Sequence, residues 1–197
     1  MDTIHLADFQ AFACTGCGLC CIRPWNVIIE PEVEDGIRNS QFHAQRVREG
    51  YVPLEIEDSG RVVAHRQKNG NCMFLKEDLL CGLHSELGST GKPVGCQIYP
   101  YRAVRTPSGT FFSMSFACPP VVAATDTDVE ANRADLTAIL ARFPDIAGEV
   151  GWVNLTGEHG IPWEGYLELE PCLLQSYLPD FPMDSVLLMA ASLASDA

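Results

Sequence analysis

Short apolar runs separated by turn-forming residues fill the first 120 positions of the chain. Five runs have the length and composition of β-strands: Asn26–Ile29, Arg61–His65, Cys72–Leu75, Tyr101–Arg105 and Thr110–Phe116. The last two flank Thr106-Pro-Ser-Gly109, which has Pro and Gly at turn positions. Lys68-Asn-Gly-Asn71, between the second and third runs, carries the Asn-Gly hairpin signal. The pattern predicts a small antiparallel core with two hairpins.

Helical patterns interrupt this core and then replace it. One helix is expected from Pro31 to about Glu49, and a short one starting near Lys92-Pro93, because Pro is favoured at the first helical position. After residue 126, apolar residues recur at helical spacing until Pro144. Two further helices are expected, from about Glu170 to Leu178 with Pro171 in its first turn, and from near Pro182. The predicted fold class is therefore α+β, with a core domain over residues 1–122 and a helical C-terminal extension over 123–197 packed on it.

Composition narrows the class of protein. A chain of 197 residues with 47% hydrophobic residues can form one domain with a short appendage. Its formal net charge of -13 repels phosphate backbones and anionic lipid headgroups, so nucleic acid is not an expected partner. The longest apolar stretch, Val186–Ala191, is far shorter than the roughly 20 residues of a membrane span, and Met1–His5 does not resemble a signal peptide. We expect a cytoplasmic protein without a membrane segment.

The nine cysteines change this picture most. In a reducing compartment, such cysteines more often bind metal or do redox chemistry than form disulfides. Cys172 stands alone in a leucine-rich segment and is interpreted as a small buried apolar residue. The other eight fall in the first 118 residues, among glycines and prolines: Cys14, Cys17, Cys20, Cys21, Cys72, Cys81, Cys96 and Cys118. These eight are the candidate metal ligands, and metal bound to them would staple the irregular β core.

The sharpest motif is Cys14-Thr-Gly-Cys-Gly-Leu-Cys-Cys21, a CxxCxxCC knuckle. Gly16 and Gly18 let the backbone bend around a metal and turn amides toward its sulfurs. If the backbone at Cys20 and Cys21 is extended, the two side chains point to opposite sides and cannot easily share one ion. That interpretation predicts two metal centres.

Eight thiols make two sets of four. Our hypothesis assigns Cys14, Cys17, Cys20 and Cys118 to one centre, and Cys21, Cys72, Cys81 and Cys96 to the other. The first set has the form of a ferredoxin-type motif, CxxCxxC plus a remote cysteine followed by proline, which favours a 4Fe-4S cluster. Tetrahedral zinc would accept either set equally well, so zinc and iron both remain open.

Several neighbours of the cysteines are candidates for supporting roles. His84 has zinc-ligand spacing from Cys81, but four cysteines already complete its set, so a hydrogen-bonded histidine beside the site is slightly favoured. Four thiolates on one zinc ion leave a net charge of about -2, which cations or backbone amides should stabilise. Arg23, Lys92 and Arg102 are the candidates for this role, with a solvated surface role equally open for each.

Several cysteine motifs together resemble the YkgJ-like CxxCxxCC family of zinc- or iron-chelating domains. The motifs are Cys14–Cys21, Gly70-Asn-Cys-Met-Phe-Leu75, Cys81-Gly-Leu-His84, Lys92-Pro-Val-Gly-Cys-Gln-Ile-Tyr-Pro100 and Cys118-Pro119. The resemblance covers about residues 10 to 120 and implies metal chelation by these cysteines. The same broad group includes flagellin lysine N-methylases, whose knuckle has wider cysteine spacing, so the resemblance also implies a protein-modifying enzyme as an alternative.

Three functions therefore stay open after the sequence alone. The first is a module in which zinc or a cluster holds a small fold together, with a possible redox role. The second is an iron–sulfur protein that transfers electrons or supports radical chemistry, and the third is an enzyme of the lysine N-methylase type acting on a protein. Whether the chain is an enzyme is left undecided, and a protein partner or protein substrate is possible in each case. Phosphate-loop, dinucleotide, HExxH and GxSxG motifs are absent from the sequence.

Overall fold

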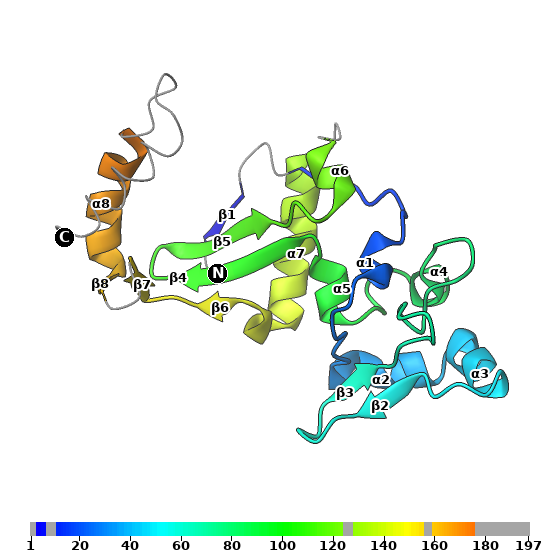
Figure 1. Cartoon of the computed structure of the whole chain (residues 1–197). Helices are drawn as coiled ribbons and strands as arrows, with labels where there is room; N and C mark the ends of the chain where they lie inside the picture. The colour runs from blue at the N-terminus through cyan, green and yellow to red at the C-terminus, as the bar shows by residue number, and fades with distance from the viewer. Residues whose placement is uncertain (1–2, 7–10, 124–127, 156–158, 176–197) are drawn as a thin grey trace. The chain divides into compact units, whose positions relative to one another are not determined.

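The computed structural model describes residues 3–6, 11–123, 128–155 and 159–175 of the chain (Figure 1). It divides into two compact units. The larger unit comprises Ile4–Ala103 and Phe112–Ala147, and the smaller one Met1–Thr3, Val104–Phe111 and Gly148–Ala197. The domain boundary expected after residue 122 stays a prediction.

The helix expected between Pro31 and Glu49 is two helices, α2 (Pro31–Arg38) and α3 (Gln41–Arg48). Buried Ser40 ends the first and begins the second. Its hydroxyl donates to the Ile37 carbonyl at 2.7 Å, and its oxygen accepts from the His43 amide at 3.1 Å. Because serine at an N-cap competes with helix continuation, the single predicted helix was wrong at this point.

A small hairpin packs near these helices. Strand β2 (Leu54–Ile56) pairs antiparallel with β3 (Val62–Ala64), with Glu55 opposite Val63. The run Arg61–His65 was thus correctly predicted as a strand, whereas Asn26–Ile29 contributes only an isolated bridge between Ile28 and Val63. The predicted strand Cys72–Leu75 is wrong, since this segment is a turn flanked by the bridges Arg66–Cys72 and Leu75–Cys81.

The second predicted hairpin is confirmed. Strands β4 (Tyr101–Thr106) and β5 (Gly109–Met114) are neighbours in a sheet of order β1-β5-β4-β6, in which β1 is Ile4–His5 and β6 is Gly148–Glu149. Strand β6 runs parallel to β4, so the sheet is mixed and not purely antiparallel as expected. The base of the β4–β5 hairpin belongs to the larger unit and its tip to the smaller unit.

Several helices of the larger unit lie between and after its strands. The helix expected near Lys92-Pro93 is α5 (Val94–Ile98), capped by Pro93, and the one expected after residue 126 is α7 (Val129–Arg142), capped by the Asp128 carboxylate. A 3-10 helix, η2 (Pro144–Ile146), follows α7. Three more helices were not predicted: α1 (Leu19–Ile22), α4 (Gly82–Leu87) and α6 (Pro119–Val122).

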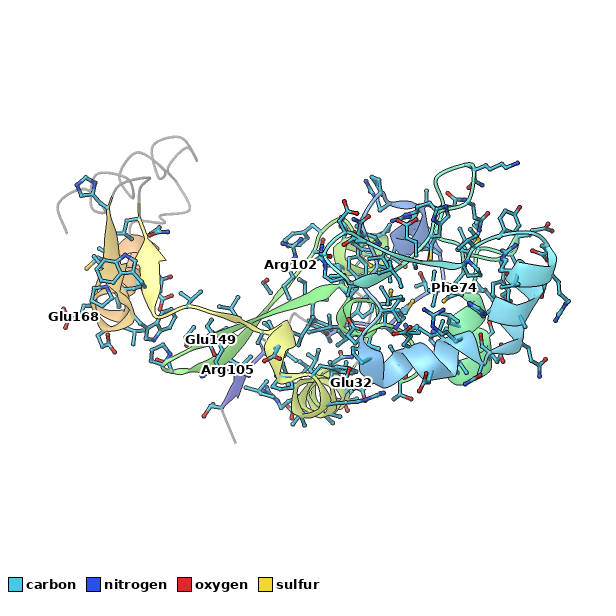
Figure 2. All side chains as sticks on the ribbon, turned by 90° about the horizontal axis from the view of Figure 1, so that it is seen from below. Glu32, Phe74, Arg102, Arg105, Glu149 and Glu168 are labelled. Carbon is cyan, nitrogen blue, oxygen red and sulfur yellow. The ribbon has the colours of Figure 1, made fainter. Side chains whose placement is uncertain are left out.

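Two apolar clusters form the core of the larger unit. One gathers α2, the β2–β3 hairpin and fully buried Phe74, which Figure 2 shows among the packed side chains. The other joins β4 and β5 to α7, with Tyr101, Phe112 and Leu136 at its centre. Burial of apolar side chains of this size stabilises a fold by about 1.5–3 kcal/mol each. The region between the two clusters contains the candidate site.

The smaller unit contains strands as well as a helix. Strands β7 (Trp152–Asn154) and β8 (Gly160–Pro162) pair antiparallel, and α8 (Trp163–Gln175) follows directly. The Trp163 indole donates to the Ser108 hydroxyl at 2.7 Å. Helix α8 begins well before the predicted position, so Pro171 lies inside it and not in its first turn. The helix expected near Pro182 lies outside the described residues.

The mixture of helices and small sheets bears out the α+β class. The C-terminal region was expected to be helical only, but it also contains the strands β6, β7 and β8. Each is two or three residues long, too short to show the alternation of apolar and polar residues that identifies a strand in a sequence. Within the described ranges, no helix has both the length and the apolar character needed to span a bilayer.

Candidate metal centre

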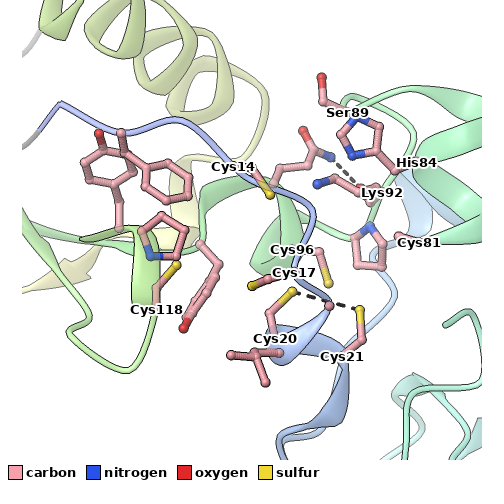
Figure 3. Close-up of a pocket in the computed structure, with 18 of the residues that line it drawn as sticks. Cys14, Cys17, Cys20, Cys21, Cys81, His84, Ser89, Lys92, Cys96 and Cys118 are labelled. Carbon is pink, nitrogen blue, oxygen red and sulfur yellow. Dashed lines mark hydrogen bonds between the residues drawn. The ribbon is translucent and has the colours of Figure 1, made fainter. Parts of the chain in front are cut away.

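All eight candidate cysteines line one cavity of the larger unit. Figure 3 labels all of them except Cys72. The cavity has a volume of about 270 Å³. Its walls come from the knuckle, from the 72–84 segment, from α5, from the start of α6 and from one face of α7. Thiols that are up to 104 positions apart in sequence, at Cys14 and Cys118, therefore face the same space.

The knuckle is bent as its glycines predicted. Gly16 and Gly18 have φ angles of 67° and 71°, in the left-handed region that favours glycine. A Cβ atom at Gly18 would lie 2.6 Å from the carbonyl oxygen of Leu79, so a side chain cannot fit there. Leu79 itself has a φ of 65°, unusual for a leucine, and this conformation brings its carbonyl against the knuckle.

Cys20 and Cys21 do not lie in extended backbone. Both belong to the single helical turn of α1, and their sulfur atoms are 3.9 Å apart (Figure 3). The expectation that they point to opposite sides was wrong, because Gly18 starts a helix at this point. With Zn–S bonds of about 2.3 Å, two sulfurs on one tetrahedral ion are about 3.8 Å apart. The two-centre hypothesis therefore cannot rest on this pair.

The remote cysteines are fixed by local turns. The Cys72 amide donates to the Cys21 carbonyl at 2.7 Å, directly after a tight turn with Gly70 at a φ of 84°. Cys81 caps α4, Cys96 lies within α5, and Cys118 caps α6. The thiols of Cys72 and Cys118 belong to buried residues, whereas Cys14 is exposed and the others are half-buried.

Backbone amides act on several of these sulfurs. The Gly16 amide donates to the Cys14 sulfur at 3.4 Å. The hydrogen bond to Cys21 is the main cause that lowers the pKa of Cys81, and the amides of His84 and Leu83 add to it. Burial raises the pKa of Cys118, and the Val121 amide opposes that rise. Neither of these two sulfurs forms a full capping hydrogen bond, so the effect is one of aligned dipoles.

The pKa values of Cys20, Cys21, Cys81 and Cys96 are shifted in different directions. Hydrogen bonding to Cys21 lowers the pKa of Cys81 to about 6 and that of Cys20 to about 7. The pKa of Cys21 is raised in return, because it keeps the proton that its neighbours share. Burial raises the pKa of Cys96. Thiolate is the form that binds metal, so this group already holds negative charge near neutral pH.

The thiols whose pKa is shifted have electrostatic partners in two groups. Cys21 interacts with Cys72 and Cys81, and the latter two act on Cys96. The pKa of Cys118, which burial raises, is raised further by the charges of Cys17, Cys14 and Cys20. Cys20 lies between the groups, because it acts on thiols of both.

The thiols surround the cavity without meeting at a point. In the described part of the chain, no three His, Cys, Asp or Glu side chains are arranged to hold one ion as they stand. Rotation of cysteine side chains about χ1 is needed to bring sulfurs into one coordination sphere. The donor set itself is suitable, since soft thiolates select zinc and iron–sulfur clusters over magnesium or calcium.

Of the three basic residues expected near the site, Lys92 fits best. It lines the cavity, and its charge adds to the lowering of the pKa of Cys20 and Cys81 that the hydrogen bond to Cys21 causes. At Cys96 it opposes the rise in pKa that burial causes. Arg23 is close enough to act on the Tyr99 phenol, whose pKa burial raises. Arg102 is exposed on β4 and does not line the cavity.

Arg66 supports the site and was not predicted. Its guanidinium donates to the carbonyls of Cys21, Gly70 and Trp25. The pKa of Cys72 is lowered mainly by the hydrogen bond to Cys21, and the charge of Arg66 adds to this effect. Arg66 therefore ties the C-terminal end of the knuckle to the turn that precedes Cys72. No sequence pattern identifies such a contact, because it joins residues 45 positions apart.

Helix α7 closes the cavity from outside the cysteine-rich segment. Asn132 accepts from the Phe12 amide at 2.8 Å and donates to the Phe12 carbonyl at 2.9 Å, which fixes the chain two residues before Cys14. Leu136 and Ile139 of the same helix line the cavity.

His84 also lines the cavity, beside Lys92 and Ser89 (Figure 3), and burial lowers the pKa of its imidazole. Cys172, expected to be buried, is exposed on α8.

A family model covers this cavity's cysteines. The model named CxxCxxCC, described as "Putative zinc- or iron-chelating domain", matches residues 13–119, which is more than half of the chain. The chain belongs to this family. Membership supports metal binding, with zinc or iron as the metal. No curated protein and no solved structure matches the chain.

Proposed function

We propose that the eight cavity thiols bind zinc or iron and that the bound metal holds the larger unit together. The observation that carries this proposal is that thiols from separate segments, including the knuckle and the 72–81 turn, line a single cavity. The helices at this cavity from the cysteine-rich segment are only four to six residues long. Helices this short are unstable alone, whereas a structural zinc site contributes about 10–16 kcal/mol to folding.

Two centres suit the arrangement of the thiols better than one. Cys72 and Cys81 act on both Cys21 and Cys96, which supports one set of four, and Cys14, Cys17 and Cys20 act on Cys118, which supports the other. Cys20 also hydrogen-bonds with Cys21, so the two centres would lie next to each other at this pair. Lys92 and Arg66 would offset the excess negative charge of the first of these sets. His84 would act beside that centre and not as a ligand.

A redox role is the second candidate, and the exposure of Cys14 favours it. A 4Fe-4S cluster on Cys14, Cys17, Cys20 and Cys118 would reach the surface at Cys14, where an electron could pass to a partner protein. Buried zinc sites need no such opening. The CxxCxxC motif with a remote Cys-Pro supports the same assignment.

The test is elemental analysis with an ultraviolet–visible spectrum on protein purified without oxygen. About two zinc ions per chain and no colour support two structural sites. Iron with acid-labile sulfide and a brown colour support the cluster. Protein that folds and carries less than about half a metal ion per chain would contradict the whole proposal.

Single-cysteine variants test the assignment of thiols to centres. Cys96→Ala and Cys118→Ala should each lose about one of two metals, while Cys172→Ala, whose cysteine is exposed on α8, should lose none. Loss of all metal in both variants, with the near-ultraviolet circular dichroism of the folded protein retained, would mean one shared centre. Full metal in both would mean that neither thiol is a ligand.

A further inference from the structure

A second cavity lies directly behind the thiol cavity in the larger unit. It has a volume of about 230 Å³ and shares Trp25, Val27, Cys96 and Tyr99 with the first. These residues form a common wall between the two spaces. Nothing in the metal-binding role uses the far side of this wall.

Two aromatic rings form a corner of this second cavity. The rings of Trp25 and Tyr99 have their centroids 4.7 Å apart and meet at 76°. Aromatic faces carry negative charge density and attract organic cations, and tryptophan does so best. Rings set nearly at right angles can act on one cation from two sides, as in aromatic cages for quaternary ammonium groups.

One carboxylate completes the cavity. Glu30 is half-buried and is the only acidic residue among the described residues that line this space, and no Lys or Arg lines it. Its Oε2 accepts from the Val94 amide at 2.8 Å, and the described residues provide it with no Lys or Arg ion pair. Burial raises the pKa of this carboxyl group, as expected where no protein cation compensates its charge.

We propose that this second cavity binds an organic ammonium group against Trp25, Tyr99 and Glu30. Its volume is below the roughly 300–1,000 Å³ typical of pockets for drug-sized ligands, so it suits a single head group or side chain. The ammonium can belong to a small free cation or to a lysine side chain of a peptide. The metal is no part of this second site, although Cys96 lines both cavities and belongs to the wall that the occupant would touch.

Isosteric ligands test the charge requirement on the unmodified full chain. Choline and its neutral carbon analogue 3,3-dimethyl-1-butanol have the same shape, and Nα-acetyl-lysine methylamide represents the peptide source. Binding is followed by NMR titration of the Trp25 indole and the Gly95 amide. We expect at least one of the two cations to bind roughly tenfold more tightly than the neutral alcohol, and the tighter cation identifies the source. Binding of neither cation above the alcohol overturns the proposal.

Variants then assign the site to its residues. Glu30→Gln retains an oxygen acceptor for the Val94 amide but removes the charge, and should weaken binding of the preferred cation roughly tenfold. Trp25→Leu should weaken it similarly. The matched controls are Glu77→Gln and Trp152→Leu, which change an exposed glutamate and an exposed tryptophan that do not line the cavity. Equal loss in the controls, or none in Glu30→Gln, contradicts the assignment, and the comparison of choline with its analogue stands even if a variant does not fold.

Discussion

At the scale of single residues, the site depends on groups that place and charge the sulfurs. The cysteines themselves could be found from the sequence, since their number and spacing are unusual. Gly18, Arg66 and Lys92 act through carbonyl contacts and charge at distances the sequence does not encode. Gly18 and Lys92 could be named from the sequence because they lie within or close to cysteine motifs, whereas Arg66 could not.

Gly18→Ala should destabilise the metal-loaded protein by about 2 kcal/mol, because the new methyl group meets the Leu79 carbonyl and the φ angle is positive. Gly50→Ala is the matched control, since Gly50 has a φ of 84° but open space around its Cα. We expect about 1 kcal/mol there. Urea unfolding measures both, and equal losses would show that the contact with Leu79 contributes nothing.

Arg66→Met should cost about 2 kcal/mol of unfolding free energy, because three carbonyls lose a charged donor. Arg61→Met, which breaks an exposed pair with Glu57, should cost at most about 0.5 kcal/mol. Chemical denaturation of both metal-loaded variants makes the comparison. If the Arg66 variant is as stable as the Arg61 variant, the contacts of Arg66 do not stabilise the site.

Glu30 should make stability depend on pH in a defined direction. Its folded pKa is raised above the ordinary 4.5 by burial, so the folded state binds a proton more readily than the unfolded state. Its contribution is therefore present below pH 4.5 and is lost as the pH rises through the folded pKa. Subtracting the unfolding free energies of Glu30→Gln from those of the wild type should show this fall. A difference that rises with pH would contradict it.

At the scale of elements, tertiary contacts determine the secondary structure of segments that are too short to show a sequence period. The β4–β5 hairpin and α7 were predicted because they span six and 14 residues with turn or cap signals. Helix α1 is four residues long and β7 three, too few to show a period. Cys72–Leu75 has the composition of a strand but is a turn. The Arg46 and Gln67 side chains bind its carbonyls, except that of Phe74, which accepts from the Gly82 amide.

Helix α7 should hold the entry to the knuckle. Asn132→Ala removes both hydrogen bonds to Phe12, so the Phe12 amide should exchange with solvent roughly tenfold faster. Thr137→Ala, which loses only a bond to the Arg133 carbonyl within the same helix, should leave that amide unchanged. Hydrogen exchange followed by NMR reports both. Unchanged protection in Asn132→Ala would mean that other contacts hold this segment.

At the scale of the whole molecule, metal should decide whether the larger unit folds. Its two apolar clusters leave the thiol cavity between them, and thiolates held close together repel one another when no metal neutralises them. Removing the metal with a chelator should abolish the near-ultraviolet circular dichroism of its aromatic residues, and adding zinc back under reducing conditions should restore it. Metal-free protein that keeps a cooperative thermal transition at the same temperature would contradict a structural role.

The part of the chain that matches the family ends at residue 119, yet the cavity does not. Leu136 and Ile139 complete its wall, and Asn132 fastens the strand of chain that leads into it. A recombinant fragment trimmed to residues 13–119 would lack this wall and Phe12, and its cavity would be open to water. A fragment for expression or mutagenesis that keeps this wall therefore has to extend beyond α7, to about Ala147, where the larger unit ends.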